Sequence, residues 1–461
     1  MATRMKSDKE LRKSVQPARA PLPPGPEGHS ILGVMPEFNR DPLEFIKGCR
    51  DYGDVVRARF LYVTAYFLYH PDDIEYVVST HAKNFIKSMS LRSNFFQRLV
   101  GNGLLTSEGE AWKRQRRLAQ PAFHRQRISA YGDVMVDYAR RMIAAWRPNE
   151  VRDIHRDMMR LTLEIVVRTL FNADVSQDAD KVGRVLSQIV KPFASQATIK
   201  WILDNRLPTA AHRRFHREAK QIDDIVYRII ADRRASGLDQ GDLLSMLLQA
   251  HDEDGSKMTD RQLRDEVMTI FLAGHETTAL TLSWTWYLLA QNRFVEQKFH
   301  AELDDVLGGR PPTMDDLPRL KYTDMIVREV MRLYPPAYGL GREAIDECEI
   351  GGFRVPRKTQ IFMFQWATQR DPRFFPEPEA FRPERWTEEF SGSLPKYAYF
   401  PFGGGPRFCI GNTFATMEIV LVLATIGQQF TLSLAPDHPV SILPAMSLRP
   451  KDGIRVVVEN R

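Results

Sequence analysis

The segment Phe402 to Gly411, which reads FGGGPRFCIG, constrains the fold of this chain more than any other. Its three consecutive glycines allow turns with positive φ and a close approach of the backbone to a flat group, while Pro406 stiffens the loop. Arg407 precedes Cys409 by two residues, and the residues after Gly411 have helical spacing. A lone cysteine is usually a small buried hydrophobe, but a position beside a cation and a helix N-terminus favours a thiolate. The segment therefore predicts a sulfur ligand.

Residues 259–290 predict one continuous helix of about 32 residues, which corresponds to roughly 48 Å at 1.5 Å per residue. Thr259 and Gln262 form a capping box at its start. The apolar pattern is interrupted in the middle by AGHETT, from Ala273 to Thr278. A purely structural interpretation is close packing at Gly274 and threonine hydroxyls that bond back to helix carbonyls.

Two further patterns pair charged or aromatic side chains one helical turn apart. Glu329 and Arg332 form E-x-x-R, with Arg385 following in FRPERW. Trp112 and Arg116 form W-x-x-x-R. Taken alone, most pairs of this kind are solvated surface contacts of small value.

Cysteine content and charge exclude several classes of protein. The three cysteines, Cys49, Cys348 and Cys409, are too few for a four-cysteine zinc or iron–sulfur site and indicate a reduced, intracellular protein. The net charge of +6 is modest for 461 residues, so we expect no nucleic-acid partner. No apolar run of about 18 residues occurs near the N-terminus, which predicts no transmembrane anchor and a cytoplasmic location.

The cysteine segment resembles the haem-binding signature F-x-x-G-x-R-x-C-x-G of cytochrome P450 monooxygenases, matched at Phe402, Gly405, Arg407, Cys409 and Gly411. The resemblance extends from about residue 21 to the C-terminus. It implies a mainly α-helical cytochrome P450 fold with small β-sheets, in which haem lies between a long central helix and the cysteine loop. It also implies a single oxygenase domain, residues 21–461, after a flexible segment of residues 1–20.

The same resemblance makes Cys409 the proximal ligand of the haem iron. Glu276 and Thr277 would be the catalytic acid and alcohol that pass protons to bound oxygen. His275 is expected to face away from haem; the alternative is a distal iron ligand. The oxygen-activation motif A-G-x-[DE]-T-T is matched at Ala273, Gly274, Glu276, Thr277 and Thr278.

Other residues are expected to hold the haem or the loop around it. Arg342 is expected to bind a haem propionate, although its motif is loose and a surface arginine is the alternative. Glu329, Arg332 and Arg385 would form a charge network that locks the cysteine loop against the core, outside the chemistry itself. The full set of expected haem-binding residues is Trp112, Arg116, Ala273, Arg342, Phe402, Arg407, Cys409 and Gly411.

The substrate-binding residues implied by the resemblance are mostly apolar, which suits a fatty acid, a terpenoid or a similar hydrophobic small molecule. Phenylalanine at such positions is more often plain core. The expected lining is Phe95, Phe96, Leu99, Val100, Phe271, Thr278, Ala337, Leu340, Ala445 and Met446.

These features predict a haem b monooxygenase that uses O2 to hydroxylate or epoxidise its substrate. A nicotinamide or flavin domain has no room beside the oxygenase, so electrons from NAD(P)H should arrive through a ferredoxin and its reductase or a flavodoxin-like donor. The basic residues Lys113, Arg114, Arg116 and Arg117 either form a solvated helix face or steer that donor. We expect a monomer.

Two alternatives are a haem sensor or carrier without turnover, against which Glu276 and Thr277 argue, and a peroxide-driven or isomerising relative.

Overall fold

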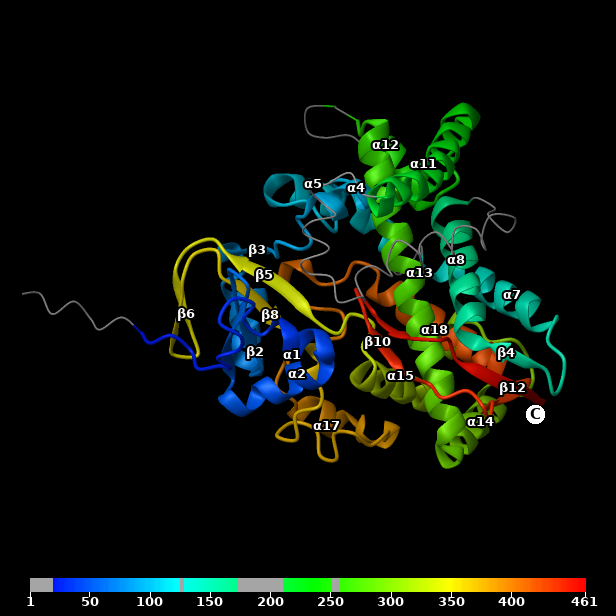
Figure 1. Ribbon diagram of the computed structural model, residues 1–461. Coiled ribbons are helices and arrows are strands. Elements are labelled where there is room, and N and C mark those ends of the chain that lie inside the picture. Colours follow the sequence, from blue (N-terminus) through cyan, green and yellow to red (C-terminus); the bar gives the residue numbers. More distant parts are fainter. Residues whose placement is uncertain (1–19, 125–127, 173–209, 251–254, 256) are drawn as a thin grey trace, which may run out of the picture.

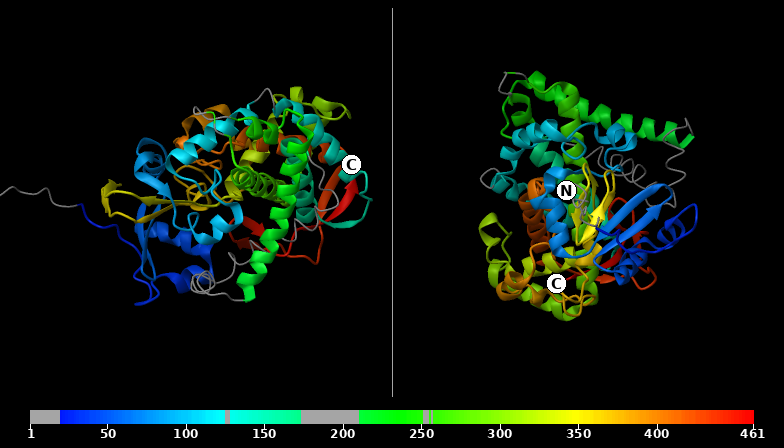
Figure 2. Two further views of the ribbon diagram at one scale, coloured as in Figure 1. Left: turned by 90° about the horizontal axis from the view of Figure 1, so that it is seen from above. Right: turned by 90° about the vertical axis from the view of Figure 1, so that its left-hand side faces the viewer.

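The computed structural model describes residues 20–124, 128–172, 210–250, 255 and 257–461. Its longest described helix, α13 (Asp260–Gln291), runs through the middle of the molecule, with a β-sheet to one side and further helices around it (Figure 1). Seen from above in Figure 2, α13 is viewed end-on and enclosed by other elements. A site at the middle of α13 therefore lies deep in the protein.

Helices make up most of the described chain. The α-helices other than α13 are α1 (Met35–Arg40), α2 (Pro42–Cys49), α3 (Pro71–Glu75), α4 (Asn94–Val100), α5 (Gly109–Ala119), α7 (Gly132–Ile143), α8 (Ile154–Phe171), α11 (Ala210–Ser236), α12 (Leu243–Gln249), α14 (Arg293–Leu307), α15 (Lys321–Leu333), α16 (Gln365–Thr368), α17 (Glu388–Ser393) and α18 (Asn412–Gly427).

The largest sheet has the strand order β1-β2-β8-β5-β3; β2 and β8 are parallel, and the other neighbours are antiparallel. A second sheet has the order β4-β12-β9, and two hairpins are formed by β6 with β7 and by β10 with β11. The strands are β1 (Val55–Phe60), β2 (Val63–Leu68), β3 (Phe85–Lys87), β4 (Val151–Asp153), β5 (Leu340–Ala344), β6 (Cys348–Ile350), β7 (Phe353–Val355), β8 (Gln360–Met363), β9 (Phe430–Leu434), β10 (Ile442–Pro444), β11 (Leu448–Pro450) and β12 (Arg455–Asn460).

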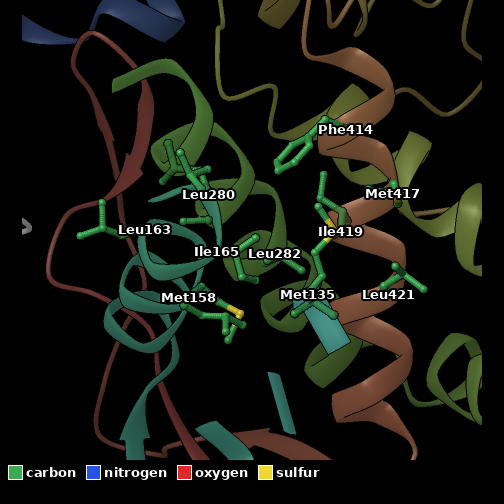
Figure 3. Close-up of a cluster of buried hydrophobic side chains, with 14 of the residues drawn as sticks. Met135, Met158, Leu163, Ile165, Leu280, Leu282, Phe414, Met417, Ile419 and Leu421 are labelled. Atoms are coloured by element: carbon green, nitrogen blue, oxygen red, sulfur yellow. The ribbon is translucent and has the colours of Figure 1, made fainter. Parts of the chain in front are cut away.

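The main apolar core lies where α13 meets α8 and α18. Figure 3 shows Leu282 of α13 between Ile165 of α8 and Ile419 of α18, with Leu280 of α13 above Ile165. Each fully buried side chain of this size stabilises the fold by about 1.5–3 kcal/mol. This packing fixes both the central helix and the helix that follows Cys409.

The predicted helices are confirmed. Thr259 is the N-cap of α13, and its reciprocal hydrogen bonds with Gln262 form the expected capping box. The helix expected after Gly411 is α18. The mainly helical fold with small sheets is also confirmed. Residues 1–19 lie outside the described part, so the separate N-terminal segment stays a prediction. Within the described residues, no helix combines the length and apolar character that crossing a bilayer requires.

Candidate functional site

The cysteine loop, residues 402–411, is a tight turn in which Cys409 lies three residues before the first residue of α18. The Cys409 N–H donates to the Phe402 carbonyl at 3.0 Å, and the Phe408 N–H donates to the Gly405 carbonyl at 3.1 Å. Gly405 has a φ of +62°, and a Cβ there would collide with the carbonyl of Val78. The glycine is therefore required both by its backbone conformation and by the close packing of the loop.

Cys409 keeps accessible surface, yet burial is the largest influence on its thiol pKa, which it raises. Cys409 thus keeps accessible surface although many protein atoms surround it. A hydrogen bond from the Gly411 backbone and the charge of Arg116 lower the pKa, but they do not outweigh burial. Without a metal, burial thus outweighs the local features that favour a thiolate. A positive charge on a bound metal would favour ionisation of this sulfur.

The middle of α13 is accessible on one stripe and buried elsewhere. Ala273 is exposed and Thr277, one turn later, is half-buried, so both lie on the same face of the helix. The Thr277 hydroxyl donates to the Ala273 carbonyl at 2.8 Å, and the Thr278 hydroxyl donates to the Gly274 carbonyl at 3.1 Å. These bonds match the structural interpretation of the threonines. They leave the lone pairs of Thr277 Oγ1 on the accessible stripe.

Glu276 is buried and ion-paired. Its Oε1 accepts hydrogen bonds from the Ser447 hydroxyl and, at 2.8 Å, from Arg449 Nε. Burial raises the pKa of this carboxyl, but Arg449 and Ser447 outweigh burial, and the pKa lies below its usual value. Sequence reasoning missed both partners, which lie 171 and 173 residues further along the chain.

His275 is buried on the same helix. Its Nδ1 lies 2.8 Å from the Phe271 carbonyl, and its own carbonyl accepts a hydrogen bond from Thr162 of α8 at 2.9 Å. Gly274 also faces α8, because a Cβ there would lie 3.2 Å from Val166. The backbone at these two residues is thus packed on α8.

A cluster of cations surrounds one carboxylate at the edge of the cysteine loop. Both nitrogens of the Arg407 fork donate to Glu108, whose Oε1 also accepts from the Lys87 backbone at 2.6 Å. Burial, assisted by Arg407, lowers the pKa of Lys87 to about 7 and that of Arg342 to about 10. Arg342 is only 8% exposed, so the surface interpretation of this residue is wrong. Lys87 and Glu108 were missed because their partners are distant in sequence.

Trp112 and Arg116 of α5 lie against the cysteine loop, and their expected role in haem binding stays a prediction. The Arg407 guanidinium carbon lies 5.3 Å from the centre of the Trp112 ring. Arg116 Nη1 donates to the Phe408 carbonyl at 2.8 Å. The two side chains thus brace the loop from outside.

Glu329, Arg332 and Arg385 are brought together in one buried network. Glu329 is fully buried and accepts from Arg332 Nη2 at 2.8 Å and from Arg385 Nε at 2.9 Å. The carboxylate also accepts from Arg332 Nε, the Trp386 indole and the Arg382 backbone. Arg332 donates in addition to the carbonyls of Gln369, Pro378 and Ala380.

The expected substrate-binding residues separate into two groups. Phe96, Leu99, Val100 and Phe271 are buried in the main apolar core, and Thr278 and Ala445 are also buried. Ala337, Leu340 and Met446 are half-buried and keep surface that a ligand could contact. The side chain of Phe95 lies outside the described part of the structure.

Two hollows flank the cysteine loop. One, of about 530 Å³, is lined by Phe402, the three loop glycines and Phe408, together with Arg328 and Lys396. The other, of about 420 Å³, is formed by Trp112, Lys113, Arg116, Arg117, Gln120, Pro121 and His124. Both are rimmed by cations.

Comparisons with known proteins agree with this geometry. The family model for Cytochrome P450 matches residues 23–458. The chain is 36% identical over 440 residues to cyclooctatin synthase of Streptomyces melanosporofaciens, covering 95% of this chain and 94% of that protein. It is 33% identical over 414 residues to pentalenene oxygenase of Streptomyces avermitilis, covering 89% of this chain and 91% of that protein. A solved structure of retinoic acid bound cyanobacterial CYP120A1 matches with a TM-score of 0.86 at 25% identity, covering 96% of this chain and all of that one.

Proposed function

Because this chain belongs to the cytochrome P450 family and is a monooxygenase of that family, we propose that it hydroxylates a cyclic terpenoid, using electrons that a separate acidic protein draws from NAD(P)H. The family implies a haem and the use of O2. The substrate class, the electron donor and the roles of individual side chains are our proposals.

The residues around Cys409 fit a haem. Cys409 keeps accessible surface at the position that the family signature gives to the iron ligand. Lys87, Arg342 and Arg407 surround the single carboxylate of Glu108, and burial, assisted by Arg407, lowers the pKa of both Lys87 and Arg342. Two propionate groups would compensate these positive charges. When bound, haem supplies the oxidant that inserts one oxygen atom of O2 into a C–H bond.

The accessible side chains on the surrounding elements support an apolar substrate, and this is the observation that carries the proposal. Ala273, Ala337, Leu340 and Met446 keep accessible surface, and Thr277 is the polar exception. An apolar site of this kind holds a hydrocarbon skeleton without a charged anchor. The similarity to pentalenene oxygenase, which acts on a terpenoid, favours a terpenoid over a fatty acid.

A ligand panel tests the substrate class. We expect cyclic terpenes to shift the Soret band of the ferric holoprotein, and turnover with a ferredoxin, its reductase and NADPH to give a terpene alcohol detectable by mass spectrometry. Soret shifts with fatty acids alone would contradict the terpenoid proposal. Product formation with hydrogen peroxide but not with NADPH and the two partner proteins would identify a peroxide-driven enzyme instead.

Thr277 and Glu276 are proposed to deliver protons to bound oxygen. Thr277 lies on the accessible stripe of α13, and Glu276 is its neighbour in the chain. The hydroxyl can accept a proton through its lone pairs while it donates to the Ala273 carbonyl. The carboxylate would resupply that proton.

Replacement of Thr277 by alanine should therefore keep haem and substrate binding but reduce the fraction of NADPH electrons that reach product by about 10²-fold, the usual scale of a lost proton-transfer group. The lost electrons should appear as hydrogen peroxide. The measurement is the ratio of product to NADPH consumed. Thr285→Ala is the matched control, because Thr285 of the same helix makes the same kind of backbone bond, to the Thr281 carbonyl, but is buried and lies outside the motif. An unchanged ratio in Thr277→Ala would contradict the relay role.

The basic hollow beside α5 is proposed to receive the electron donor. Lys113, Arg117 and His124 line it, and Arg116 connects it to the cysteine loop through the Phe408 carbonyl. A negatively charged surface on the donor would be attracted to this side of the protein and would bring its redox centre close to the loop.

Reversing charge at Lys113 and Arg117 together should slow reduction by a ferredoxin about tenfold at low salt, with a smaller effect at high salt. Stopped-flow reduction under carbon monoxide measures the rate. Lys220→Glu is the control, since this exposed residue of α11 lines neither hollow. Equal rates for the double variant and wild type would place the donor elsewhere.

A further inference from the structure

The hairpin of β10 and β11 is fixed rigidly across α13. The Trp284 indole donates to the Leu448 carbonyl at 2.9 Å, and the Leu448 N–H donates to the Pro336 carbonyl at 3.0 Å. At the hairpin tip, the Tyr338 hydroxyl donates to the Ala445 carbonyl at 2.9 Å. Ser447 and Arg449 therefore approach α13 from a backbone that has little freedom to move.

Both side chains converge on one oxygen of Glu276. Arg449 Nε donates to Oε1 at 2.8 Å, Arg449 Nη2 lies 2.7 Å from the same oxygen, and Ser447 also donates to it. Glu276 is 2% exposed and Arg449 is 8% exposed, so water screens this ion pair weakly. The hydrogen bonds of the neighbouring Thr277 go to a different partner, the Ala273 carbonyl.

This geometry conflicts with a simple relay. A carboxylate that accepts bonds from a guanidinium and a hydroxyl has no proton to give, and it is oriented toward the hairpin. To resupply Thr277 it must first take up a proton or move away from Arg449.

We propose that Arg449 is a positioning residue of the proton relay: with Ser447 it holds Glu276 as an ion-paired carboxylate against the β10–β11 hairpin, and so keeps the charge of this acid, and with it the coupling of electrons to product, independent of pH. The proposal rests on the relay role given to Glu276 and Thr277 above. It adds a residue from the C-terminal hairpin to the oxygen-activating machinery and explains why the acid is ionised before oxygen binds.

Few other charges act on Glu276. His275 of α13 and His155 of α8 are its titratable neighbours, and burial lowers the pKa of both, that of His155 to about 4. Both are therefore neutral near pH 7. Asp153, the N-cap of α8, acts on His155 rather than on Glu276 directly. Arg449 is thus the main positive charge that opposes the burial of the carboxylate.

Arg449→Met in the full-length holoprotein tests the proposal. Without the guanidinium, burial dominates and the pKa of Glu276 should rise, so that the group is protonated at low pH and ionised at high pH. Infrared spectra of the ferric protein, recorded at several pH values between about 6 and 9, should then show a carboxylic-acid C=O band that the wild type lacks and that weakens as the pH rises. Coupling of NADPH use to product should fall severalfold over the same range, whereas the wild type stays flat.

Three further variants separate positioning from general damage. Arg449→Lys keeps the charge and should keep the flat profile. Arg449→Met with Glu276→Gln should lose both the infrared band and the new pH dependence. Ser447→Ala removes one donor to the same oxygen and should give a smaller change in the same direction, which provides a test if Arg449→Met fails to bind haem.

The outcomes distinguish the two proposals. A flat pH profile with no acid band in a haem-loaded Arg449→Met enzyme would overturn the role of Arg449, and so would a pH dependence that persists after Glu276→Gln. Normal coupling in Glu276→Gln alone would remove the relay role of that acid, and the inference would fall with it. Failure of wild type to hydroxylate any terpene would refute the proposed substrate and leave the infrared result on Arg449 intact.

Discussion

Replacing Cys409 with serine is expected to abolish the strongly red-shifted Soret band that reduced, thiolate-ligated haem shows under carbon monoxide, and to lower product formation by at least about 10³-fold. A serine hydroxyl keeps its proton at neutral pH and cannot act as a thiolate donor to iron. The measurement is the absorption spectrum of the dithionite-reduced protein with and without carbon monoxide, followed by turnover.

The other two cysteines provide matched controls. Cys49 is buried in α2 and Cys348 is half-buried in β6, both away from the cysteine loop. Serine at either position should leave the carbon monoxide spectrum unchanged. A thiolate-type band that survives in Cys409→Ser would show that another residue binds the iron.

Glu329→Gln should have the largest effect on folding, a loss of about 3–5 kcal/mol in the free energy of unfolding. The carboxylate is fully buried and is the shared acceptor of Arg332 and Arg385. An amide of the same shape carries no charge, and its NH2 group would point at a donor. Two guanidinium groups would then lack their anionic partner. Urea denaturation and the yield of haem-loaded protein measure the effect.

Glu384→Gln controls for the substitution itself. Glu384 is in the next short helix turn, Pro383–Arg385, and its ion pair with Lys298 is exposed on both sides. Loss of this ion pair should lower the free energy of unfolding by at most about 1 kcal/mol. Equal midpoints of urea denaturation for Glu329→Gln and Glu384→Gln would contradict a structural role for the buried network.

The sequence was most informative where the physical signal is local. The N-terminus of α13 could be predicted to the residue because Thr259 and Gln262 make a reciprocal cap, and the helix after Gly411 followed from its apolar spacing. The sheet order could not be predicted, because β2 pairs with the distant strand β8, with Ala65 opposite Gln360. Strand pairing over such distances depends on the packing of both faces, which a local pattern does not encode.

In the candidate site, too, local patterns could be predicted and contacts between distant parts of the chain could not. Ala273 and Thr277 could be placed on one stripe from helical spacing alone. The partners of Glu276 and Arg407 could not, because Arg449 and Glu108 are ordinary charged residues far away in sequence. Apolar character alone also does not separate a ligand site from the core: Phe96, Leu99 and Val100 are buried in the main apolar cluster, and their contact with substrate stays a prediction.

The sheet formed by β4, β12 and β9 has a consequence for how the protein is made. Asp153 accepts a hydrogen bond from the backbone of Ile454, 301 residues later, and β12 lies between β4 and β9. A nascent polypeptide on the ribosome therefore carries α8 and α13 long before Cys409 and Arg449 have been synthesised. Larger proteins commonly pass through such incomplete states. Cofactor loading through the Cys409 sulfur must accordingly wait until the growing chain has reached that residue, and a chain that stops soon after Cys409 would lack both β12 and the hairpin that holds Glu276.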